Sequence, residues 1–328
     1  MFSVPDSGRI AAVTHAKIVV PDDYPSVLAG TPAEALLRTV GEVTIFSARG
    51  ADDEAELIRR IGDAEAALNI RAHARFSAAV LKSSPRLRLI SVWGTGTDHI
   101  DLDVCKERGV KVARTAGVNA NAVAEHAVTL MLSALRRIAA LDAEMRAGGW
   151  ARAPIAQLEG KTVGIVGLGP IGVRVASLLK PFGVQLLAAS RGPDDGRAAA
   201  VGARHVPIET LLAESDVVTL HFRLDADTRG CLSTERLALM KPGAILVNTA
   251  RGALIDQQAL VHALSTGQIA GAGLDVFHEE PLPQSDALRL LPNVVLTPHI
   301  AGNTPEVIAD GLALAVQNID HFLRASSD

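Results

Sequence analysis

Short apolar runs alternate with longer amphipathic stretches from Lys17 onward. Runs rich in β-branched residues predict strands, and the segments between them, such as Asp53–Ile61 and Phe76–Ser83, have helical spacing. The predicted strands are Lys17–Val20, Glu42–Phe46, Ala66–Ile70, Leu87–Val92 and Val110–Ala113. Strands that alternate with helices in this way predict βαβ units and a parallel sheet.

A second series of the same kind begins at Lys161. Its predicted strands are Thr162–Val166, Gln185–Ala189, Asp216–Leu220, Ala244–Asn248, Ile269–Leu274 and Asn293–Thr297. The first of these strands runs directly into glycines. The pattern predicts a second α/β domain with its own parallel sheet.

Two long helical patterns lie outside these series. Asn119–Gly148 is rich in Ala and Leu, and its length predicts one linking helix that begins at Asn caps and ends at Gly148-Gly149. Thr304–Leu323 is an amphipathic pattern that follows the last strand and predicts a final helix.

The length of 328 residues is about twice the ~150 residues expected for one domain, which agrees with two domains. Apolar residues make up 48% and charged residues 21%, as in ordinary globular proteins. The net charge is only -4, and no Lys or Arg run forms a basic patch. A nucleic acid or a charged membrane surface is therefore not predicted as a partner.

Cys105 and Cys231 are the only cysteines, and they form no CxxC or Cys/His cluster. This excludes a disulfide framework and a structural zinc site, and no metal is predicted. Residues Met1–Ala16 lack a basic region followed by an apolar stretch, so they do not resemble a signal peptide. No apolar segment reaches the ~18 residues of a membrane span. We expect a cytoplasmic protein.

The glycines after the strand Thr162–Val166 form the motif Gly167-Leu168-Gly169-Pro170-Ile171-Gly172, which a helical pattern follows. In this context the first glycine allows a tight turn, the second lets backbone approach a pyrophosphate, and the third permits close packing of helix on strand. N–H groups at the helix start attract phosphate. An ordinary Gly-rich turn is the alternative, but strand, glycines and helix are all in register for a dinucleotide site.

Several further motifs share one order along the chain. They are GTGTDHIDLD (94–103), HFRLDADTRG (221–230), MKPGAILVNTARGALID (240–256), AGAGLDVFHEEPLP (270–283) and NVVLTPHIAGNT (293–304). Together with the glycine motif they cover nearly the whole chain. In these motifs the chain resembles the D-isomer-specific 2-hydroxyacid dehydrogenases, the family of phosphoglycerate dehydrogenase and glyoxylate/hydroxypyruvate reductase.

The resemblance implies two Rossmann-like or flavodoxin-like α/β domains, one inserted into the other. A substrate domain would comprise residues 1–113 and 304–328, and a dinucleotide-binding domain residues 114–303. The implied activity is hydride transfer between NAD(P)H and a small 2-keto acid or D-2-hydroxy acid, with glyoxylate and hydroxypyruvate as the leading substrates. The family also forms dimers around Asn119–Trp150, so a homodimer is expected.

Reduction of a keto acid needs a cation to hold the carboxylate and a proton donor for the carbonyl oxygen. The resemblance assigns the first role to Arg251 and the second to His299, with Glu280 pairing with the histidine and favouring its charged form. Taken singly, Arg251 could form a surface ion pair, His299 could be a satisfied loop residue, and Glu279-Glu280 could be a solvated turn. The family places the acid directly before the proline, which selects Glu280 over Glu279.

Other binding residues follow from the resemblance alone. The loop Thr95-Gly96 would donate N–H groups to the substrate carboxylate, and Arg71 would lie near the substrate, unless it is a solvated loop charge. Asp275 and the carbonyl of Thr249 would fix the nicotinamide amide. His221 would also contact the cofactor.

The position after Gln185–Ala189, where an NAD enzyme places an Asp for the ribose, is Ser190, followed by Arg191. Ser190 neither accepts hydrogen bonds from the ribose as an Asp does nor repels a 2′-phosphate, and Arg191 offers a guanidinium for that phosphate. NADP is therefore the expected cofactor, with NAD possible. The alternative is that Arg191 points into solvent and that Asp194 or Asp195 reaches the ribose for NAD.

The chain departs from the family pattern at two positions: Ala72, where some relatives have Ser, and Arg223, where many have Pro. These departures leave the identity of the substrate undetermined. Three rival functions are compatible with the fold. One is a dinucleotide-sensing corepressor, for which nothing basic or modular argues. Another is formate dehydrogenase, whose histidine pairs with an amide instead of the carboxylate of Glu280. The third is a catalytically inactive family member that only binds the nucleotide.

Overall fold

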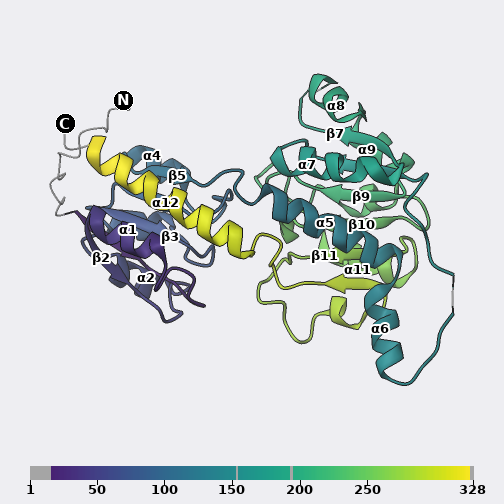
Figure 1. Cartoon of the computed structure of the whole chain (residues 1–328), viewed down its shortest axis with the longest axis horizontal. Helices are drawn as coiled ribbons and strands as arrows, with labels where there is room; N and C mark the ends of the chain where they lie inside the picture. Colours follow the sequence, from purple (N-terminus) through teal and green to yellow (C-terminus); the bar gives the residue numbers. More distant parts are fainter. Residues whose placement is uncertain (1–15, 153, 193–194, 326–328) are drawn as a thin grey trace, which may run out of the picture. The chain divides into compact units, whose positions relative to one another are not determined.

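The structure, a computed structural model, describes residues 16–325 except 153 and 193–194. The chain forms two compact units. One unit combines residues up to Val118 with those from Pro305 onward, and the other consists of Asn119–Thr304. The second unit is therefore inserted between the two segments of the first (Figure 1).

The first unit is built on a parallel sheet in the order β2-β1-β3-β4-β5. Its strands are β1 (Lys17–Val20), β2 (Glu42–Ile45), β3 (Ala66–Asn69), β4 (Leu89–Val92) and β5 (Lys111–Arg114). Its helices are α1 (Pro32–Val40), α2 (Glu54–Ile61), α3 (Ala78–Ser83), α4 (Leu102–Arg108) and α12 (Pro305–Ala325). The strands lie where the apolar runs predict them.

Helices cover both faces of this sheet, as a parallel sheet requires. On one face, α1 and α12 pack against β1, β3 and β4, with Leu37 and Ile319 fully buried. On the other face, α2, α3 and α4 enclose a core around Phe76 and Leu81. The last helix of the chain thus completes the core of the first unit.

The second unit contains a longer parallel sheet in the order β12-β11-β10-β9-β6-β7-β8. Its strands are β6 (Thr162–Val166), β7 (Gln185–Ala189), β8 (Ala203–His205), β9 (Val217–Leu220), β10 (Ile245–Asn248), β11 (Gly271–Leu274) and β12 (Val294–Leu296). The strand β8 was not predicted, because its three residues carry no run of β-branched side chains.

One face of this sheet is covered by α5, α7 and α8, and the other by α9, α10 and α11. The helices are α5 (Ala120–Leu135), α6 (Ile138–Arg146), α7 (Pro170–Leu179), α8 (Asp195–Val201), α9 (Ile208–Glu214), α10 (Thr234–Leu237) and α11 (Gln257–Ser265). Among the described residues, the short 3-10 helices are η1 (Lys180–Phe182), η2 (Gly252–Leu254) and η3 (Ala287–Leu290).

The prediction of one continuous helix over Asn119–Gly148 is wrong. The segment divides into α5 and α6 at Arg137, whose φ of 52° is left-handed. A right-handed helix cannot continue through a left-handed residue. Residue periodicity is the same on both sides of the break, so it gives no sign of it.

The strand order of the second unit reverses between β6 and β9, because the chain passes from β6 to β7 on one side and later reaches β9 on the other. Open α/β sheets bind ligands at such a switch point, beyond the carboxyl ends of the strands. Within the described residues, no helix combines the length and apolar character needed to cross a bilayer.

Candidate active site

The predicted site residues of the second unit follow neighbouring strands at one edge of its sheet. Gly167 follows β6, His221 follows β9, Arg251 follows β10, Asp275 follows β11, and His299 follows β12. All these strands are parallel, so their carboxyl ends share the same edge. The fold therefore brings together residues that lie more than a hundred positions apart.

The glycine turn after β6 has the geometry of a dinucleotide cradle. Gly167 has a φ of 101°, and a Cβ there would lie 2.8 Å from the carbonyl carbon and oxygen of His221. A Cβ on Gly172 would lie 2.0 Å from the Gly167 oxygen, so the start of α7 can approach the turn only with glycine. A Cβ on Gly169 would meet nothing within 4 Å. The middle glycine thus faces open space while the other two are fixed by packing.

The side chains of His299 and Glu280 are joined by a hydrogen bond. Nδ1 of His299 lies 2.7 Å from Oε2 of Glu280, and Oε1 of Glu280 accepts a hydrogen bond of 2.9 Å from the Phe277 backbone N–H. An ionised carboxylate only accepts, so Nδ1 carries the proton in this pair. Nε2 of His299 is then the ring nitrogen that remains for a ligand.

The charge of Glu280 is stabilised by its surroundings. Burial raises the pKa of its carboxyl, but the hydrogen bond and charge of His299, the Phe277 N–H and the charge of Arg251 outweigh burial. The pKa of Glu280 is therefore below its usual value, and the carboxylate is ionised at neutral pH.

Arg251 lies close enough to act electrostatically on Glu280, so the structure brings the three predicted catalytic side chains into one neighbourhood. Its Nη1 donates a hydrogen bond of 2.8 Å to the Ala250 carbonyl, and its own carbonyl accepts from Asn248 Nδ2 at 2.8 Å. These bonds fix the turn that directs the guanidinium. A guanidinium can hold a carboxylate through two parallel hydrogen bonds.

The buried carboxylate of Asp275 binds the loop that carries His299. Oδ1 accepts hydrogen bonds from Thr297 Oγ1 at 2.6 Å and from the Ile300 N–H at 3.0 Å, and Oδ2 accepts from the Ala301 N–H at 2.9 Å. The backbone carbonyl of Asp275 also accepts from the His299 N–H at 2.8 Å. The assignment of Asp275 to the nicotinamide amide stays a prediction, but its carboxylate already has this structural function.

Two observations test whether this edge fits a dinucleotide. Thr249 Oγ1 is buried and has no hydrogen-bond partner among the described residues, as expected of an atom that hydrogen-bonds a ligand. His221, whose Nε2 lies 2.8 Å from Thr219 Oγ1, has its pKa lowered by burial to about 3, so it is neutral. With the open side of Gly169, these features fit a nicotinamide dinucleotide.

The residues expected to choose between NAD and NADP are engaged within the chain. Ser190 Oγ lies 3.0 Å from the Gly192 carbonyl and 3.1 Å from His205 Nε2. The Arg191 side chain is 58% exposed, and its Nη2 forms an ion pair with Asp225 in the loop after β9. Asp194 and the side chain of Asp195, the alternative ribose ligands, lie outside the described residues.

Arg71 in the first unit follows β3 and is partly enclosed. Its guanidinium lies 5.9 Å from the centre of the Trp93 ring and hydrogen-bonds the Pro25 carbonyl through Nη2, while its Nε is buried with no hydrogen-bond partner among the described residues. Burial lowers the pKa of Arg71, an effect that the charges of Asp23 and Asp22 oppose. A partly desolvated guanidinium with an unused N–H is suited to an anion.

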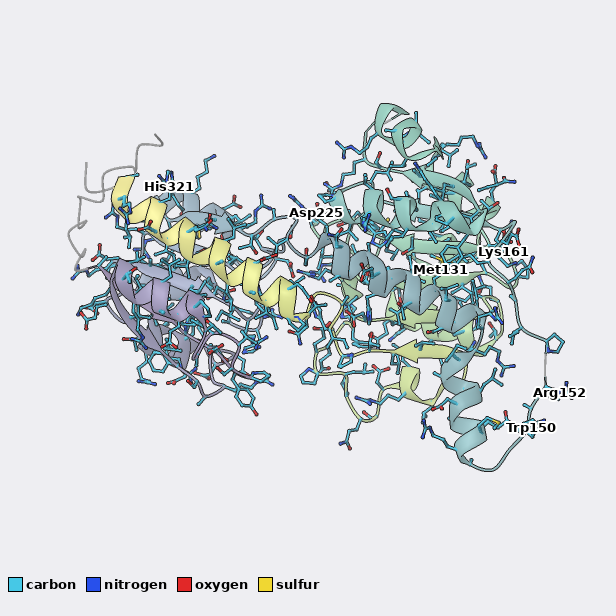
Figure 2. The ribbon with its side chains drawn as sticks, viewed as in Figure 1. Met131, Trp150, Arg152, Lys161, Asp225 and His321 are labelled. Carbon is cyan, nitrogen blue, oxygen red and sulfur yellow. The ribbon has the colours of Figure 1, made fainter. Side chains whose placement is uncertain are left out.

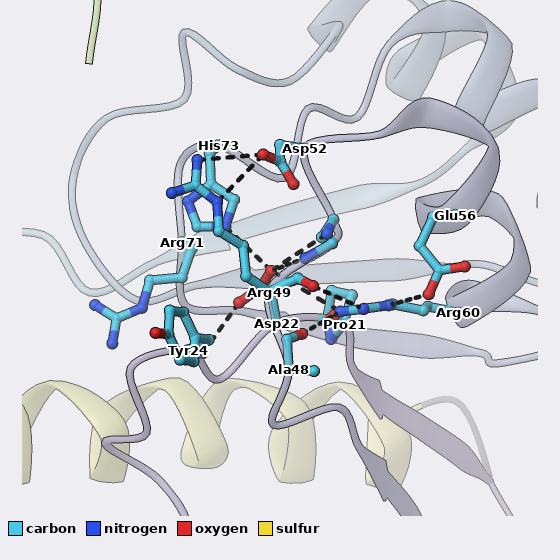
Figure 3. Close-up of polar contacts among 12 residues, drawn as sticks. Pro21, Asp22, Tyr24, Ala48, Arg49, Asp52, Glu56, Arg60, Arg71 and His73 are labelled. Atoms are coloured by element: carbon cyan, nitrogen blue, oxygen red, sulfur yellow. Dashed lines mark hydrogen bonds and ion pairs between the residues drawn. The ribbon is translucent and has the colours of Figure 1, made fainter. Parts of the chain in front are cut away.

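Asp22, which was not predicted, ties the loops around Arg71 together (Figure 3). Its buried carboxylate accepts from the backbone N–H groups of Tyr24, Gly50 and Ala51 and lies 3.1 Å from His73 Nε2. Burial raises the pKa of Asp22, but the hydrogen bonds from His73, Ala51 and Tyr24 outweigh burial, so the pKa of Asp22 is below the usual Asp value and the carboxylate is charged at neutral pH. The loops after β1, β2 and β3 are therefore held by one carboxylate.

The loop Thr95-Gly96 follows β4, at the same sheet edge as Arg71 because β3 and β4 are neighbours. It begins at Gly94, which has a φ of 139° and donates its N–H to Thr115 Oγ1 at 2.8 Å. Thr95 and Gly96 themselves are half-buried.

Sequence analysis missed residues whose partners are distant in the chain. Besides Asp22 and Asp225, the most prominent is His126 on α5, which lies 2.9 Å from Thr297 Oγ1. The sequence held no distinctive signal for His126, since the same helical pattern also carries polar residues such as Glu125 and Thr129.

Comparisons with known proteins identify the family of this chain. The family model of the D-isomer specific 2-hydroxyacid dehydrogenase NAD binding domain matches residues 128–301. The chain is 40% identical over 254 residues to the glyoxylate reductase of Thermococcus litoralis, covering 75% of this chain and 76% of that protein. It is 37% identical to the D-3-phosphoglycerate dehydrogenase of Mycobacterium leprae over 287 residues, 87% of this chain and 54% of that protein.

Among solved structures, an acyclic imino acid reductase (Bsp5) in complex with NADPH and D-Arg is 28% identical to this chain. It superimposes with a TM-score of 0.85, covering 94% of this chain and 97% of that one. These matches favour a reductase over the corepressor and formate dehydrogenase alternatives. The chain belongs to the D-isomer-specific 2-hydroxyacid dehydrogenases and is an oxidoreductase that uses a nicotinamide dinucleotide.

Proposed function

We propose that this enzyme reduces glyoxylate or hydroxypyruvate to the corresponding 2-hydroxy acid, with NADPH as its preferred reductant. The observation that carries the proposal is the Glu280–His299 hydrogen bond beside Arg251, at the sheet edge that also holds the glycine turn. The glyoxylate reductase relative supports the same substrate class.

The roles of the protein groups follow from their chemistry. Arg251 binds the carboxylate of the keto acid and draws electron density from the neighbouring carbonyl. His299 gives a proton from Nε2 to the carbonyl oxygen, and Glu280 holds the ring through Nδ1 and balances the charge of the imidazolium. Bound NADPH supplies the hydride that reaches the carbonyl carbon. The imidazole then regains its proton from water.

The second unit would hold the dinucleotide. Gly167–Gly172 would hold the pyrophosphate at the start of α7, with Leu168 and Ile171 shaping the turn and Pro170 as the first helical residue. His221, Asp275 and Thr249, with its backbone carbonyl and its buried Oγ1 that has no partner among the described residues, would surround the nicotinamide. Ser190 and Arg191 would bind the adenosine 2′-phosphate. For this, the Arg191 guanidinium would have to break its ion pair with Asp225 and pair with the phosphate instead.

The first unit would be the substrate domain, with Arg71 and the N–H groups of Thr95-Gly96 as its contribution. The unused Nε of Arg71 supports this role. A substrate with a polar or anionic second end, such as hydroxypyruvate, would benefit from Arg71 more than glyoxylate does.

We also propose a homodimer built around Asn119–Trp150, the segment that contains α5 and α6. None of the residues of α6 is buried, and two of them, Ile138 and Met145, are large apolar residues that are 55% and 51% exposed. Trp150, just beyond the end of α6, is 74% exposed (Figure 2). Such exposed apolar side chains are typical of surfaces that another chain covers. Sedimentation that shows only a ~34 kDa species at micromolar concentration would contradict the dimer.

Assays of the purified enzyme test the proposed reaction. We expect NADPH to be consumed with glyoxylate and hydroxypyruvate, faster than with NADH. His299→Ala should lower kcat by about 10²–10⁴-fold while binding of NADPH is kept. Absence of turnover with any small 2-keto acid, while NADPH still binds, would instead indicate the inactive family member considered above.

A further inference from the structure

The position of His299 is unusual for its backbone conformation. Its φ of 53° is left-handed, a region that residues with a Cβ occupy only where the surrounding structure fixes them. Three consecutive backbone N–H groups, those of His299, Ile300 and Ala301, donate to Asp275. Asp275 is therefore the group that fixes the histidine backbone.

The carboxylate of Asp275 is 0% exposed, so protein donors must satisfy it. Besides the two backbone N–H groups, Thr297 Oγ1 lies 2.6 Å from Oδ1, and His126 Nε2 lies 3.5 Å from the same oxygen. His126 lies on α5, near the first residue of the inserted unit, whereas Thr297 and His299 lie near its last residue. One helix therefore contributes a side chain to the anchor of the His299 loop.

The direction of these hydrogen bonds is determined by proton counting. A hydroxyl group has a single hydrogen, and Thr297 uses it toward the ionised Asp275. Thr297 Oγ1 can then only accept from His126 Nε2, 2.9 Å away. His126 must therefore carry a proton on Nε2, and the chain runs from His126 through Thr297 to Asp275.

We propose that His126 is a positioning residue for His299. It acts by completing the donor set of Asp275 through Thr297, and it touches neither the substrate nor the reacting atoms. This inference rests on the proposed role of His299 as proton donor. Without the donor on His126, Thr297 is free to rotate its hydroxyl away, and Asp275 then loses its side-chain hydrogen-bond donor.

Kinetics of paired variants test the proposal. We expect His126→Leu and Thr297→Val each to lower kcat about 10-fold to 100-fold, because small displacements of a catalytic group have effects of this size. KM for NADPH should be unchanged. The double variant should lose no more than either single variant, since both break the same chain of bonds. His126→Gln, which keeps an N–H at the end of its side chain, should recover most of the rate.

A matched control lies on the same helix. Thr129 is exposed and hydrogen-bonds only the Glu125 carbonyl within its own helix, so Thr129→Ala should leave kcat at the wild-type value. Additive losses in the double variant, or no rescue by glutamine, would overturn the proposal. If His126→Leu does not fold, Thr297→Val against Thr297→Ser makes the same comparison.

NMR of isotope-labelled imidazole groups separates this proposal from the proposed reaction, because it needs no turnover. In the wild type, His126 should show a proton on Nε2, and the Nδ1 proton of His299 should be protected by Glu280. In Thr297→Val the His299 signal should broaden or exchange faster. An unchanged His299 signal would refute the positioning role even in an active enzyme, and an inactive enzyme with the expected signals would refute only the proposed reaction.

Discussion

Replacing Glu280 by glutamine tests how much the charge beside His299 contributes to catalysis. The carboxylate uses two oxygens, Oε2 toward His299 and Oε1 toward the Phe277 N–H. A glutamine offers only one oxygen, so Glu280→Gln leaves either the imidazole or the backbone N–H without an acceptor. The substitution also removes the negative charge that stabilises an imidazolium.

The size of the effect follows from the exposure of the pair. A hydrogen bond to a charged group contributes about 1.5–3 kcal/mol when it is protected from water. The side chains of His299 and Glu280 are 43% and 36% exposed, so solvent screening reduces this. About 1–2 kcal/mol then remains, which corresponds to a fall in kcat of roughly 5–30-fold, smaller than that of His299→Ala.

The assay compares kcat and KM for NADPH-dependent keto acid reduction in the two adjacent variants Glu280→Gln and Glu279→Gln. Glu279 is exposed and precedes the residue that bonds His299, so its replacement serves as the matched control. We expect a loss in kcat for Glu280→Gln alone, with KM for NADPH preserved. Equal kcat values in the two variants would refute the assigned role, and would show that an amide orients the histidine as well as a carboxylate does.

Three further predictions concern the cofactor site and its support. Asp225→Asn should raise the ratio of kcat/KM for NADPH over NADH severalfold because it frees Arg191, whereas Asp227→Asn in the same loop should not. Gly172→Ala should lower Tm because its Cβ meets backbone at 2.0 Å, whereas Gly169→Ala should keep Tm and weaken NADPH binding in a titration. Asp275 has a lowered pKa when folded, so its contribution to stability is complete above the ordinary Asp value of ~3.9 and is lost as pH falls through the folded pKa. Asp275→Asn should therefore lower Tm more at pH ~7 than below pH ~3.

The strands and the glycine turn were predictable because their signals are local. Apolar runs mark β6 and β9, and the turn after β6 needs glycine for reasons of backbone geometry that neighbouring residues reveal. The strand β8 has no apolar run and depends on pairing with β7, so the sequence did not predict it. The break at Arg137 is likewise invisible to periodicity.

Only those site residues that lie in the family motifs could be predicted from the sequence. The resemblance paired His299 with Glu280, and the structure places them in contact. It did not predict that Asp225 would hold Arg191, or that His126 would reach Thr297 across 171 positions. Such contacts depend on how segments far apart in the chain meet in the fold, and no local pattern encodes that.

The split first unit constrains the order in which the newly made chain can fold. Its sheet is synthesised before the inserted unit, but α12, which covers one face together with α1 and packs Leu312, Val316 and Ile319 against the strands, is synthesised after it. Until the ribosome has completed that helix, the face keeps its apolar side chains in water, a state prone to association with other chains. The inserted unit has all its strands and its own core before then, so during translation it can fold first, and the first unit is completed only after α12 has been made.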